Sequence, residues 1–389
     1  MTFDDDARRL ILENVERFAR ERVRPRAAAI DRDNLFPRDL FDEAAALGLF
    51  GLGVPEEYGG LGRDIVTPLL ISERLARESA AFALIFNNTT DSTVPIVDCA
   101  GEALKRRYLP AIARGELIPC ISITEPQGGS DVSAIRSSAR RHGDGYVLTG
   151  RKMWCSNAGV GDLFTIFVRT DPAGGHRGLS AFLVPKDAPG LKVGRPEDLI
   201  GLRGSPIAEL ILEDVEVPAA NLLGREGDGF RIAMLTLDES RLHCAAMALG
   251  VATKAASLAI DYARQREQFG QPIIRHQGLQ FLLADMATEL AAARALWQSA
   301  ARRMLAAHDR EASVHCGMTK LVCSDLCMKI TTDAVQVLGA NGLSRAYEVE
   351  RLMRDAKAFQ IFDGTSQIQR SMIGRYLDRE GLPFGYLEA

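Results

Sequence analysis

The sequence predicts a mostly helical α+β protein with three domains: an N-terminal α-helical domain (1–118), a middle domain forming a small antiparallel β-barrel (119–225), and a C-terminal four-helix-type bundle (226–389). Three observations lead to this prediction. Apolar residues recur at helical spacing in the first part, alternate with a period of two in the second, and return to helical spacing in an alanine-rich third part. A chain of 389 residues is long enough for two or three domains of ordinary size.

The composition is that of a globular protein without strong charge bias. Hydrophobic residues make up 47% of the chain and charged residues 25%, which does not match a disordered protein. The formal net charge of -4 and the sequence pI near 6.0 argue against nucleic acid or an anionic membrane as a partner. We therefore expect local arginines, and not an overall electrostatic field, to hold any anionic ligand.

Targeting signals and metal motifs are missing from the sequence. The first residues, MTFDDDARRL, are acidic and lack the apolar segment of a secretory signal. We find no stretch that approaches the roughly 18 apolar residues needed to cross a bilayer. The seven cysteines form no CxxC pair and have no histidines at metal-ligand spacing, so no metal site is expected. Together these features predict a cytoplasmic protein with reduced thiols, in which Cys323 and Cys327 are small buried hydrophobes.

The N-terminal part is expected to contain several amphipathic helices. The stretch DDDARRLILENVERFARERVRP has an apolar stripe and acids in its first turn, and Pro25 interrupts it. A second helix is expected in PRDLFDEAAALGLFGL. A glycine-rich loop, VPEEYGGLGRD, then leads to one more helix in TPLLISERLARESAAFALIF.

Short strands are expected in the middle part, separated by Gly, Asp and Pro. They are GDGYVLTGRKMWCSNAG, DLFTIFVRT, GLSAFLVPK and AELILEDVEVP. In the last of these, Leu210 and Leu212 alternate cleanly, and Val215 and Val217 resume one residue out of phase, which predicts a β-bulge. Because no helices intervene, we expect a small antiparallel barrel or sandwich.

The third part is expected to be a helical bundle with an extra helix. Long helices can be drawn at about 227–268, 276–308, 311–338 and 345–358, with a terminal one after 365.

Two stretches of the middle part carry possible binding chemistry. In CISITEPQGGSDVSAIRSSA a strand is expected to end at Thr124, after which Gly128, Gly129 and Ser130 let backbone amides approach a ligand. The alternative is a plain turn, and the GxGxxG order of a dinucleotide site is missing. In RKMWCSNAG, Trp154 lies beside Ser156 and could form an aromatic wall for a flat heterocycle, or could belong to the core.

Five motifs in order along the chain carry a family resemblance. They are ITEPQGGSD, KMWCSNAG, REQFGQPI, VQVLGANGL and IFDGTSQIQR, and with them the chain resembles a flavin-dependent acyl-CoA dehydrogenase. The resemblance implies a helical domain, a β-domain and a helical bundle that enclose FAD and an acyl-CoA thioester, usually in a homotetramer. It also implies that electrons pass on to an electron-transfer flavoprotein.

The resemblance also implies which residues bind FAD and CoA. Those expected to line the flavin, with Ser156 near its reactive N5 and Thr124 near the ring edge, are Ile121, Ser122, Ile123, Thr124, Gly129, Ser130, Trp154, Cys155 and Ser156. Those expected to hold the adenosine and pyrophosphate, partly across a subunit interface, are Arg266, Phe269, His276, Gln277, Gln336, Val337, Gly339 and Ala340. Thr365 and Gln367 match a further FAD contact. Arg241 and Ser130 match residues near the CoA end of the substrate; for Arg241 the alternative is a solvated helix face.

Asp363 occupies the place of the usual family base. The family reaction removes a proton α to the thioester while a hydride leaves the β-carbon for the flavin, and most members have glutamate immediately before GTSQ. Other members have glutamate at the position of Ser240, and Glu239 is expected to point elsewhere. Aspartate is shorter by about 1.5 Å, and a misplacement of about 1 Å can cost about 100-fold in rate. Asp363 therefore predicts an inactive enzyme or a substrate with its acidic hydrogen nearer the backbone; the alternative is that an Asp or Thr here caps the last helix.

Asp91 is a second acid in an unusual place. It lies in ALIFNNTTDSTVPIVDCAG, whose counterpart in the family covers the acyl channel and is usually apolar. A buried acid there must be hydrogen-bonded or used, and the alternative is an N-cap near Pro95. Two aspartates at one acyl pocket resemble the alicyclic branch of the family. That resemblance implies that Asp91 and Asp363 are catalytic, with Asp91, which would also contact the substrate, as the candidate base and Asp363 as its partner. Which of the two takes the proton stays open at this point.

The alternatives for the reaction stay open at this point. First is 1,4-dehydrogenation of cyclohex-1-ene-1-carboxyl-CoA to cyclohexa-1,5-diene-1-carboxyl-CoA, followed by 1,2-dehydrogenation of cyclohexane-1-carboxyl-CoA. A short or branched acyl-CoA is third. From another class, a non-catalytic flavin- or CoA-binding paralogue is considered because Asp replaces Glu.

Overall fold

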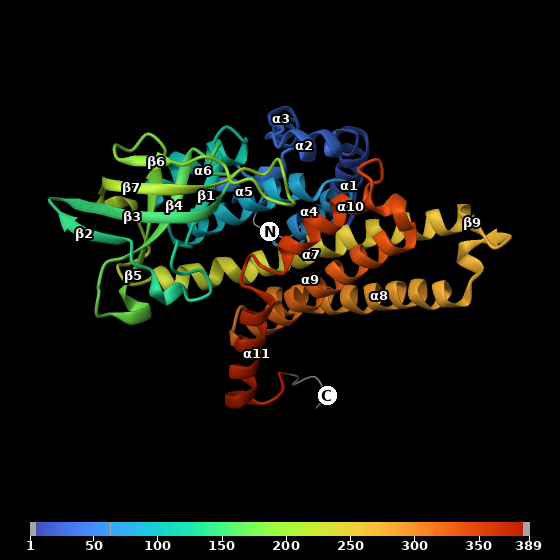
Figure 1. Cartoon of the computed structure of the whole chain (residues 1–389). Helices are drawn as coiled ribbons and strands as arrows, with labels where there is room; N and C mark the ends of the chain where they lie inside the picture. The colour runs from blue at the N-terminus through green and yellow to red at the C-terminus, as the bar shows by residue number, and fades with distance from the viewer. Residues whose placement is uncertain (1–4, 63, 384–389) are drawn as a thin grey trace.

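The structure is a computed structural model that describes residues 5–62 and 64–383. Figure 1 shows the sheet at one end of the molecule, the N-terminal helices beside it, and the long C-terminal helices running away from it toward β9. The predicted fold class is confirmed: helices come first, a β domain follows, and a helical bundle completes the chain. Both ends of the predicted outer domains, residues 1–4 and 384–389, lie outside the described residues.

The N-terminal part is helical throughout. Its helices are α1 (Asp5–Phe18), η1 (Ala19–Val23), η2 (Arg24–Arg26), α2 (Ala27–Asp33), α3 (Arg38–Ala46), η3 (Leu49–Gly53), η4 (Glu56–Tyr58), α4 (Val66–Glu78), α5 (Ala80–Cys99) and α6 (Glu102–Ala113). The regular α-helix ends at Phe18, and the chain then passes through a π-turn and a 3-10 turn that contains Pro25, so this proline interrupts the helical stretch as expected.

The single helix predicted over 67–86 is wrong, because the chain breaks at Ser79. Ser79 has extended backbone angles (φ -156°, ψ 111°), and its hydroxyl accepts a hydrogen bond from the N–H of Phe82. Ser79 therefore caps α5. The helix then continues through the polar stretch around Asp91, where the sequence suggested a helix end. The hydroxyls of Thr89 and Thr93 donate to carbonyls one turn back, at 2.9 and 2.8 Å. These bonds satisfy the hydroxyls inside the helix.

The strands of the described part form one mixed sheet and one small hairpin. They are β1 (Pro119–Ser122), β2 (Ser138–His142), β3 (Gly145–Ser156), β4 (Leu163–Arg169), β5 (Leu179–Pro185), β6 (Leu191–Val193), β7 (Ile207–Pro218) and β8 (Leu222–Leu223), with β9 (Glu267–Gln268) and β10 (Gln271–Pro272) in the hairpin. The order in the large sheet is β6-β7-β3-β2-β4-β5-β8, and β1 pairs with β4. The pairs β1–β4 and β2–β4 are parallel, which the purely antiparallel prediction missed. Short 3-10 turns in this part are η5 (Val132–Ala134), η6 (Gly175–Gly178) and η7 (Ala219–Asn221).

Two bulges distort the β3–β7 ladder. Leu148 pairs with Val215 and Gly150 with Leu212, so β7 holds one extra residue there, as predicted, and Asp214 has a positive φ of 52°. A second irregularity lies between Lys152 and Cys155 of β3, where Trp154 has a φ of 60°. The sequence did not predict the second bulge, which re-aims the tryptophan.

The C-terminal part holds the longest helices. They are α7 (Gly229–Gln265), α8 (Gln277–Ala306), α9 (Arg310–Leu338), α10 (Val349–Phe359) and α11 (Ser366–Glu380), with η8 (Ile273–Arg275) and η9 (Gly339–Leu343) between them. Within the described residues, α7 is long and apolar enough to cross a membrane by length and composition alone, which corrects the expectation that no segment would be. However, 78% of its most apolar window is buried inside the protein, as in the core helix of a soluble protein.

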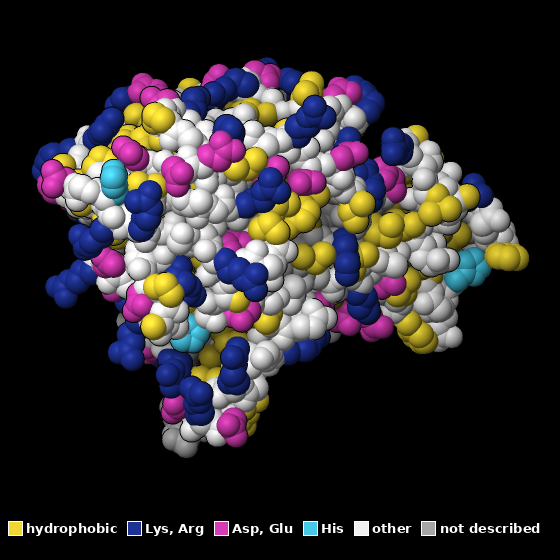
Figure 2. Space-filling view, turned by 60° about the vertical axis from the view of Figure 1, so that its left-hand side comes forward, with side chains coloured by type: hydrophobic (Ala, Val, Ile, Leu, Met, Phe, Trp, Pro, Cys, Tyr) yellow, Lys and Arg dark blue, Asp and Glu magenta, His cyan; other side chains and the backbone are white. Residues whose placement is uncertain are grey.

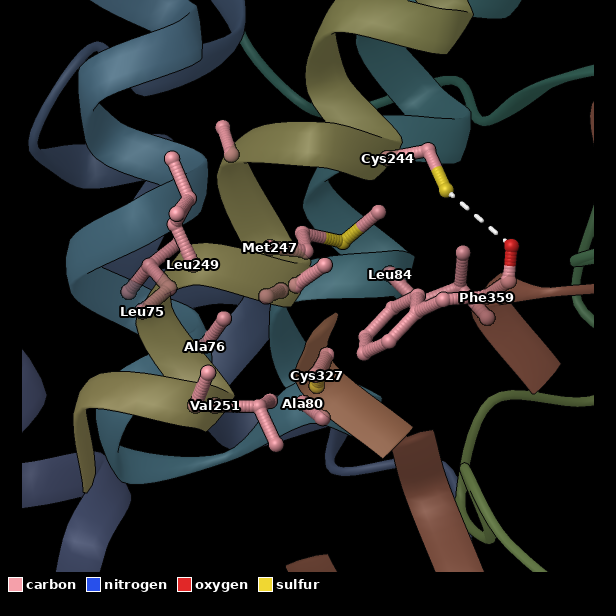
Figure 3. Packing of buried hydrophobic residues seen from close by; sticks show 14 of the residues in the cluster. Leu75, Ala76, Ala80, Leu84, Cys244, Met247, Leu249, Val251, Cys327 and Phe359 are labelled. Atoms are coloured by element: carbon pink, nitrogen blue, oxygen red, sulfur yellow. Dashed lines mark hydrogen bonds between the residues drawn. The ribbon is translucent and has the colours of Figure 1, made fainter. Parts of the chain in front are cut away.

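The main core lies where α4, α5, α7, α9 and α10 meet. Figure 3 shows Leu75, Met247, Leu249 and Phe359 packed there, and each side chain of this size contributes about 1.5–3 kcal/mol when buried. The thiol of Cys244 lies 3.7 Å from the carbonyl oxygen of Phe359. All seven cysteines are free, and Cys323 and Cys327 are buried, as expected. This packed centre holds fixed the segments that lead to the candidate site.

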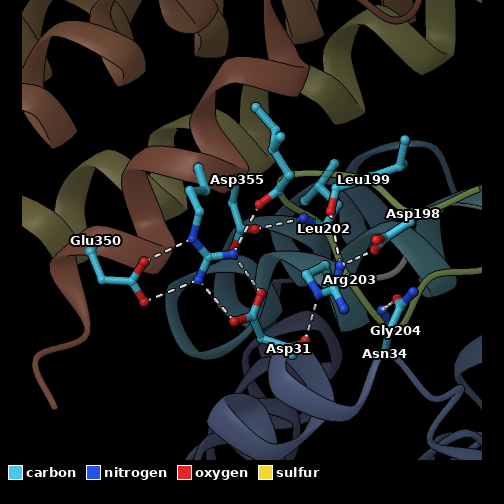
Figure 4. A network of polar contacts seen from close by, with 11 residues as sticks. Asp31, Asn34, Asp198, Leu199, Leu202, Arg203, Gly204, Glu350 and Asp355 are labelled. Carbon is cyan, nitrogen blue, oxygen red and sulfur yellow. Dashed lines mark hydrogen bonds and ion pairs between the residues drawn. The ribbon is translucent and has the colours of Figure 1, made fainter. Parts of the chain in front are cut away.

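A polar network joins the three parts of the chain (Figure 4). The guanidinium of Arg354 makes two 2.8 Å ion-pair hydrogen bonds to Asp31 and binds Glu350 at 2.7 and 3.0 Å. The next residue, Asp355, accepts a 2.6 Å hydrogen bond from the N–H of Leu202. Burial raises the pKa of Asp355 to about 6. We call Arg354, Asp31, Glu350 and Asp355 the arginine-centred cluster.

Candidate active site

Asp91 and Asp363 reach the same buried site from different parts of the chain. Asp91 lies on α5 and is 5% exposed, and Asp363 lies in the loop between α10 and α11. Burial and, next to it, the charge of Asp363 raise the pKa of Asp91 well above its usual value. The hydroxyl of Ser240 on α7 lowers the pKa of both aspartates, which places it beside both carboxyls. We call Asp91, Asp363 and Ser240 the aspartate site.

The backbone around Asp363 is held in an uncommon conformation. Asp363 and Gly364 both have positive φ, 54° and 89°, which is rare for a residue with a side chain. The amide of Gln369 donates to the carbonyl oxygens of both residues at 3.0 and 3.1 Å, and Lys320 Nζ donates to that of Gly364 at 2.8 Å. These bonds fix a strained turn that aims the aspartate side chain inward.

The side chain of Asp363 is not used as a helix cap. Thr365 caps α11, because its hydroxyl accepts a 3.2 Å hydrogen bond from the N–H of Ile368. The Oδ2 atom of Asp363 is buried and has no hydrogen-bond partner. Burial raises the pKa of Asp363, and the charges of Lys320 and Arg241 lower it. Of the two residues considered as the cap of the last helix, Thr365 is therefore confirmed and Asp363 is wrong.

Asp91 lies in the middle of α5, so its N-cap alternative is wrong as well. The helix spans Ala80–Cys99, and its N-cap is Ser79. Pro95 lies four residues beyond Asp91 inside the same helix. Proline has no N–H, so the carbonyl of Asp91 lacks the helical hydrogen bond that it would otherwise accept.

His243 was not singled out from the sequence, but it faces Asp91. Its Nε2 lies 3.8 Å from Asp91 Oδ1, and its Nδ1 lies 2.8 Å from the hydroxyl of Ser72. Burial lowers the pKa of His243 to about 3, so the ring is neutral at physiological pH. The spacing of three residues from Ser240 on α7 was the available signal, since such residues share a helix face.

Arg241 is buried, which contradicts its solvated-face alternative. It is 5% exposed, and its guanidinium pairs with Asp238 at 2.6 Å. Asp238 also binds His308, 3.2 Å away, and the hydroxyl of Ser313. The Nε of Arg241 has no hydrogen-bond partner. Glu239 is also buried and raises the pKa of Asp91 less than Asp363 does.

The residues predicted to line a flavin come together on one side of β3. The N–H of Met153 donates to the carbonyl of Thr124 at 2.8 Å, which brings the two motifs side by side. Trp154 is 51% exposed, so its core alternative is wrong. The buried hydroxyl of Ser122 has no partner in the protein. An open aromatic face, adjacent backbone amides and an unpaired hydroxyl fit a flat, polar-edged heterocycle.

Not every predicted flavin residue offers its side chain. Cys155 is 1% exposed, and its thiol lies 3.5 Å from the carbonyl oxygen of Ile121. Ile121, Ile123, Thr124 and Ser156 are half-buried, and Gly129 and Ser130 are exposed in the loop that follows. Cys155 could therefore contact a cofactor only through its backbone.

A buried ion pair that the sequence did not reveal lies under this loop. Lys152 Nζ binds Glu125 Oε1 at 2.7 Å, with side chains only 0% and 2% exposed. Glu125 also accepts hydrogen bonds from the N–H groups of Arg136 and Ser137 at 2.7 and 3.0 Å. Burial would raise the pKa of Glu125, but Lys152 and these bonds hold it near 2. The pair ties the Thr124 loop to the strand that carries Trp154.

The residues predicted to hold adenosine and pyrophosphate lie far from Trp154 in one chain. Phe269 and His276 lie at the β9 end of the bundle, opposite to β3 in Figure 1. Phe269 is 93% exposed, with its ring edge-on to that of His276 at 5.8 Å. Exposed residues of this set also include Arg266, Gln277, Gln336, Gly339 and Ala340, whereas the side chain of Val337 is buried. Gln367 is exposed at the start of α11.

Among the described residues, no group of three or more His, Cys, Asp or Glu side chains is arranged to hold a metal ion.

Models of three domains match almost the whole chain. They are "Acyl-CoA dehydrogenase, N-terminal domain" over residues 5–116, "middle domain" over 120–215 and "C-terminal domain" over 227–377. Among similar proteins, "Cyclohex-1-ene-1-carbonyl-CoA dehydrogenase" of Syntrophus aciditrophicus is 43% identical over 376 residues, covering 96% of this chain and 90% of the relative. "Acyl-CoA dehydrogenase" of Bacillus subtilis is 43% identical over 368 residues, covering 93% and 96%.

Solved structures agree with these matches. Butyryl-CoA dehydrogenase from Megasphaera elsdenii is 36% identical with a TM-score of 0.93, covering 97% of this chain and 100% of that one. A chain from work on the electron transferring flavoprotein of Acidaminococcus fermentans is 39% identical with a TM-score of 0.92, covering 98% and 100%. The "FAD complex of PigA" is 27% identical with a TM-score of 0.92, covering 97% and 99%.

Proposed function

This chain belongs to the acyl-CoA dehydrogenase family, and we propose that it catalyses 1,4-dehydrogenation of cyclohex-1-ene-1-carboxyl-CoA to cyclohexa-1,5-diene-1-carboxyl-CoA. As an acyl-CoA dehydrogenase it oxidises a CH–CH unit of an acyl-CoA thioester and uses FAD. The observation that carries the choice of substrate is the meeting of Asp91 and Asp363 in one buried site. The similarity to a cyclohexene-carbonyl-CoA dehydrogenase supports it.

The ring substrate explains why a base at the usual position would not reach the hydrogen that must be removed. A ring with a double bond conjugated to the thioester has no ordinary α-proton, so the acidic hydrogen is a vinylogous one farther round the ring. A base for that hydrogen must lie away from the usual position. Asp91 meets this need, because α5 brings it to the site from a different direction than the α10–α11 loop brings Asp363.

We assign the ring-proton transfer to Asp91, with Asp363 as its partner. A carboxylate whose pKa is raised is a stronger base than ordinary aspartate, which suits proton abstraction from carbon. Two carboxyls this close titrate as a pair, so the first proton bound is shared by the site. In the assigned ground state one carboxyl is ionised and ready to accept the substrate proton.

The cofactor and the surrounding side chains complete the assignment. When bound, FAD accepts the hydride that leaves the substrate. Thr124, Trp154 and Ser156 are assigned to hold its ring, and the Glu125–Lys152 pair keeps their two segments in register. Arg241 and Ser130 are kept as predicted substrate contacts. The buried surroundings of Asp91 exclude water from the proton transfer.

The second candidate is 1,2-dehydrogenation of cyclohexane-1-carboxyl-CoA with Asp363 as the α-base. One observation favours it: the charges of Lys320 and Arg241 favour the ionised form of Asp363. A short-chain substrate is third, supported by the similarity to a butyryl-CoA dehydrogenase.

A homo-oligomer, with a tetramer as the family expectation, is part of the proposal. Figure 2 shows yellow hydrophobic side chains along the surface of the helical part. Exposed apolar residues of this part include Phe269 (93%), Phe281 (62%), Leu343 (76%) and Ile361 (55%). A second subunit that covers them would also bring the adenosine residues of one chain to the flavin residues of the other. An electron-transfer flavoprotein as acceptor and a cytoplasmic location stay predictions.

The test compares two ring substrates on the wild-type holoenzyme without oxygen. The purified protein should be yellow, and the cyclohexene thioester should bleach it and yield the 1,5-diene faster than the saturated ring thioester reacts. Products are separated by mass spectrometry and by their ultraviolet absorbance. If only the saturated ring is oxidised, the second candidate replaces the first; if butyryl-CoA is the best substrate, the ring assignment fails.

A further inference from the structure

His243 is a buried histidine that no step of the proposed reaction uses. Its helix, α7, packs against α4 and α5. Its Nδ1 lies 2.8 Å from the hydroxyl oxygen of Ser72 on α4, and its Nε2 lies 3.8 Å from Asp91 Oδ1 on α5. The exposed fractions of His243, Ser72 and Asp91 are 4%, 0% and 5%. The imidazole therefore joins a hydroxyl on one helix to the proposed base on another, in a place that excludes water.

The hydroxyl of Ser72 decides which ring nitrogen carries the proton. Among the residues that the structure describes, the ring of His243 is the only hydrogen-bond partner of this hydroxyl. If Nδ1 carried the proton, it would donate to Ser72, and the O–H of Ser72 would be buried without an acceptor, which is unfavourable. The favoured tautomer therefore has the Ser72 hydroxyl donating to Nδ1 and the ring proton on Nε2.

The Nε2–H group of this tautomer faces Asp91. Burial lowers the pKa of His243 to about 3, so the ring is not an imidazolium at neutral pH. The 3.8 Å separation is longer than a hydrogen bond, and hydrogen bonds at catalytic sites are often long before the substrate binds and shorten in the complex. A neutral N–H directed at a carboxylate favours the ionised form without adding a positive charge.

The groups that face Asp91 from other elements define the surroundings in which His243 acts. Burial raises the pKa of Asp91 most. After burial, two acids raise it and two neutral side chains lower it, and these four residues are Asp363, Glu239, Ser240 and Asn87. The cations Lys320 and Arg241 lower the pKa of Asp363. Among the described residues, Asp91 thus depends on neutral donors, and not on a lysine or arginine partner, for its ionised form.

We propose that His243 is a positioning residue for Asp91, with Ser72 holding its ring in the tautomer that directs Nε2–H at the carboxylate. The inference rests on the proposed function, in which Asp91 accepts the ring proton of the substrate. His243 does not take up that proton, because Nδ1 accepts from Ser72 and Nε2 already carries a hydrogen. Its role is to keep the carboxylate ionised and in place, which matters because a misplacement of about 1 Å can cost about 100-fold in rate.

The kinetic test removes the donor and then restores it. His243→Leu should raise the pKa of Asp91, so the acid limb of the kcat profile should move to higher pH by about one unit. On that limb kcat should fall about tenfold, and at high pH it should change little. His243→Gln keeps an acceptor for Ser72 and an N–H for Asp91, so it should return the limb toward its wild-type position.

The control for the kinetic test is His315→Leu, because His315 is as buried as His243, at 5% exposed, but lies on α9. A merely structural role for His243 would lower kcat by the same factor at every pH and would leave the limb in place. An unmoved limb in His243→Leu, or a limb that moves as far in His243→Gln, overturns the proposal.

Nitrogen-15 NMR of the holoenzyme labelled at histidine tests the tautomer directly. The His243 signals are identified by their loss in His243→Gln, and they should show a protonated Nε2 and an unprotonated Nδ1 from about pH 5 to pH 9. A proton on Nδ1 within this range overturns the proposal. Because no acyl-CoA is present, the result does not depend on which acyl-CoA is oxidised. A failure of the ring-substrate assignment can thus be distinguished from a failure of this inference.

Discussion

Asp31 and Glu350 pair with Arg354 where the three parts of the chain meet, whereas Asp91 and Asp363 share a site with each other. In the first cluster, Arg354 makes four charge-assisted hydrogen bonds to two carboxylates, and these acids raise its pKa although burial lowers it. In the second, neither carboxylate forms an ion pair with a lysine or arginine of the described residues. Asp363 Oδ2 is buried without any partner.

We interpret this difference as one between carboxylates that stabilise the fold and carboxylates that are proposed to take part in the reaction. A buried carboxylate that is paired with a cation has its hydrogen-bonding positions filled and stays ionised, so it is a poor proton acceptor. A buried carboxylate left beside another one keeps a raised pKa and an unfilled hydrogen-bonding position. The protein therefore maintains the aspartate site at a cost in stability, which is typical of a functional site.

Replacing Asp91 should have the largest effect of the changes considered, and that effect should be on catalytic activity. Asp91→Asn should lower kcat about 100- to 10,000-fold, the usual contribution of a general base. Flavin absorbance should be unchanged, and the free energy of unfolding at pH 7 should rise, because a buried acid with a raised pKa is gone. Anaerobic single-turnover kinetics and urea unfolding measure both. Asp363→Asn provides the comparison, and wild-type turnover in Asp91→Asn would remove that residue from the mechanism.

Removing the cation of the arginine-centred cluster should act in the opposite way. Arg354→Met leaves two half-buried carboxylates without their partner and should lower the free energy of unfolding by about 2–3 kcal/mol. The control is Arg370→Met, whose 2.7 Å pair with Asp325 is more exposed and should cost about 1 kcal/mol or less. Urea denaturation measures both. Equal losses for the two variants would mean that burial does not distinguish these pairs.

Asp355 is the acid of the arginine-centred cluster whose burial is least offset by nearby positive charge. Its pKa is about 6 in the folded protein, above the ordinary value of 3.8, so the folded state binds its proton more tightly than the unfolded state. Its contribution to stability is therefore most favourable below about pH 4 and falls as pH rises to about 6. Asp355→Asn should remove this dependence, worth about 3 kcal/mol, and keep an oxygen for the N–H of Leu202. Urea unfolding between pH 4 and pH 7 compares the two proteins; parallel curves would contradict the assignment.

Ser240 should give the smallest effect. Its hydroxyl favours the ionised form of both aspartates, so Ser240→Ala should raise their pKa values. A hydrogen bond of about 1 kcal/mol corresponds to somewhat less than one pH unit. The acid limb of the kcat/KM profile should therefore move to higher pH by up to about one unit. Ser180→Ala is the control, because Ser180 is also buried but lies on β5 of the β domain. An acid limb that does not move in Ser240→Ala would show that the hydroxyl does not face Asp91 and Asp363.

Much of the fold follows from local patterns in the sequence. Helical periodicity predicted the long C-terminal helices to within a few residues, apart from the later start of α10 at Val349. The phase shift after Leu212 predicted the bulge in β7. Both signals depend on residues close together in the chain. The parallel pairing of β1 with β4 could not be predicted, because Pro119 and Leu163 are brought together by the whole domain.

The aspartate site was predicted in part. Two acids out of place in the motifs led to Asp91 and Asp363, because an apolar setting makes an acid conspicuous. The roles of His243 and of the Glu125–Lys152 pair were invisible, since each depends on partners that are distant in sequence: 171 residues separate Ser72 from His243, and 27 separate Glu125 from Lys152. The break at Ser79 was missed because one capping hydrogen bond outweighed a continuous apolar pattern.

Pro95 gives the helix that carries Asp91 a mechanical weak point. Along the 20 residues of α5, the turn that contains Asp91 lacks one backbone hydrogen bond, so bending of the helix concentrates there. A small bend at this turn displaces the Asp91 carboxylate without breaking any other backbone hydrogen bond of the helix. In the proposed reaction, the Asp91 carboxylate can thus follow the ring carbons as they flatten, while the rest of α5 stays packed in the core.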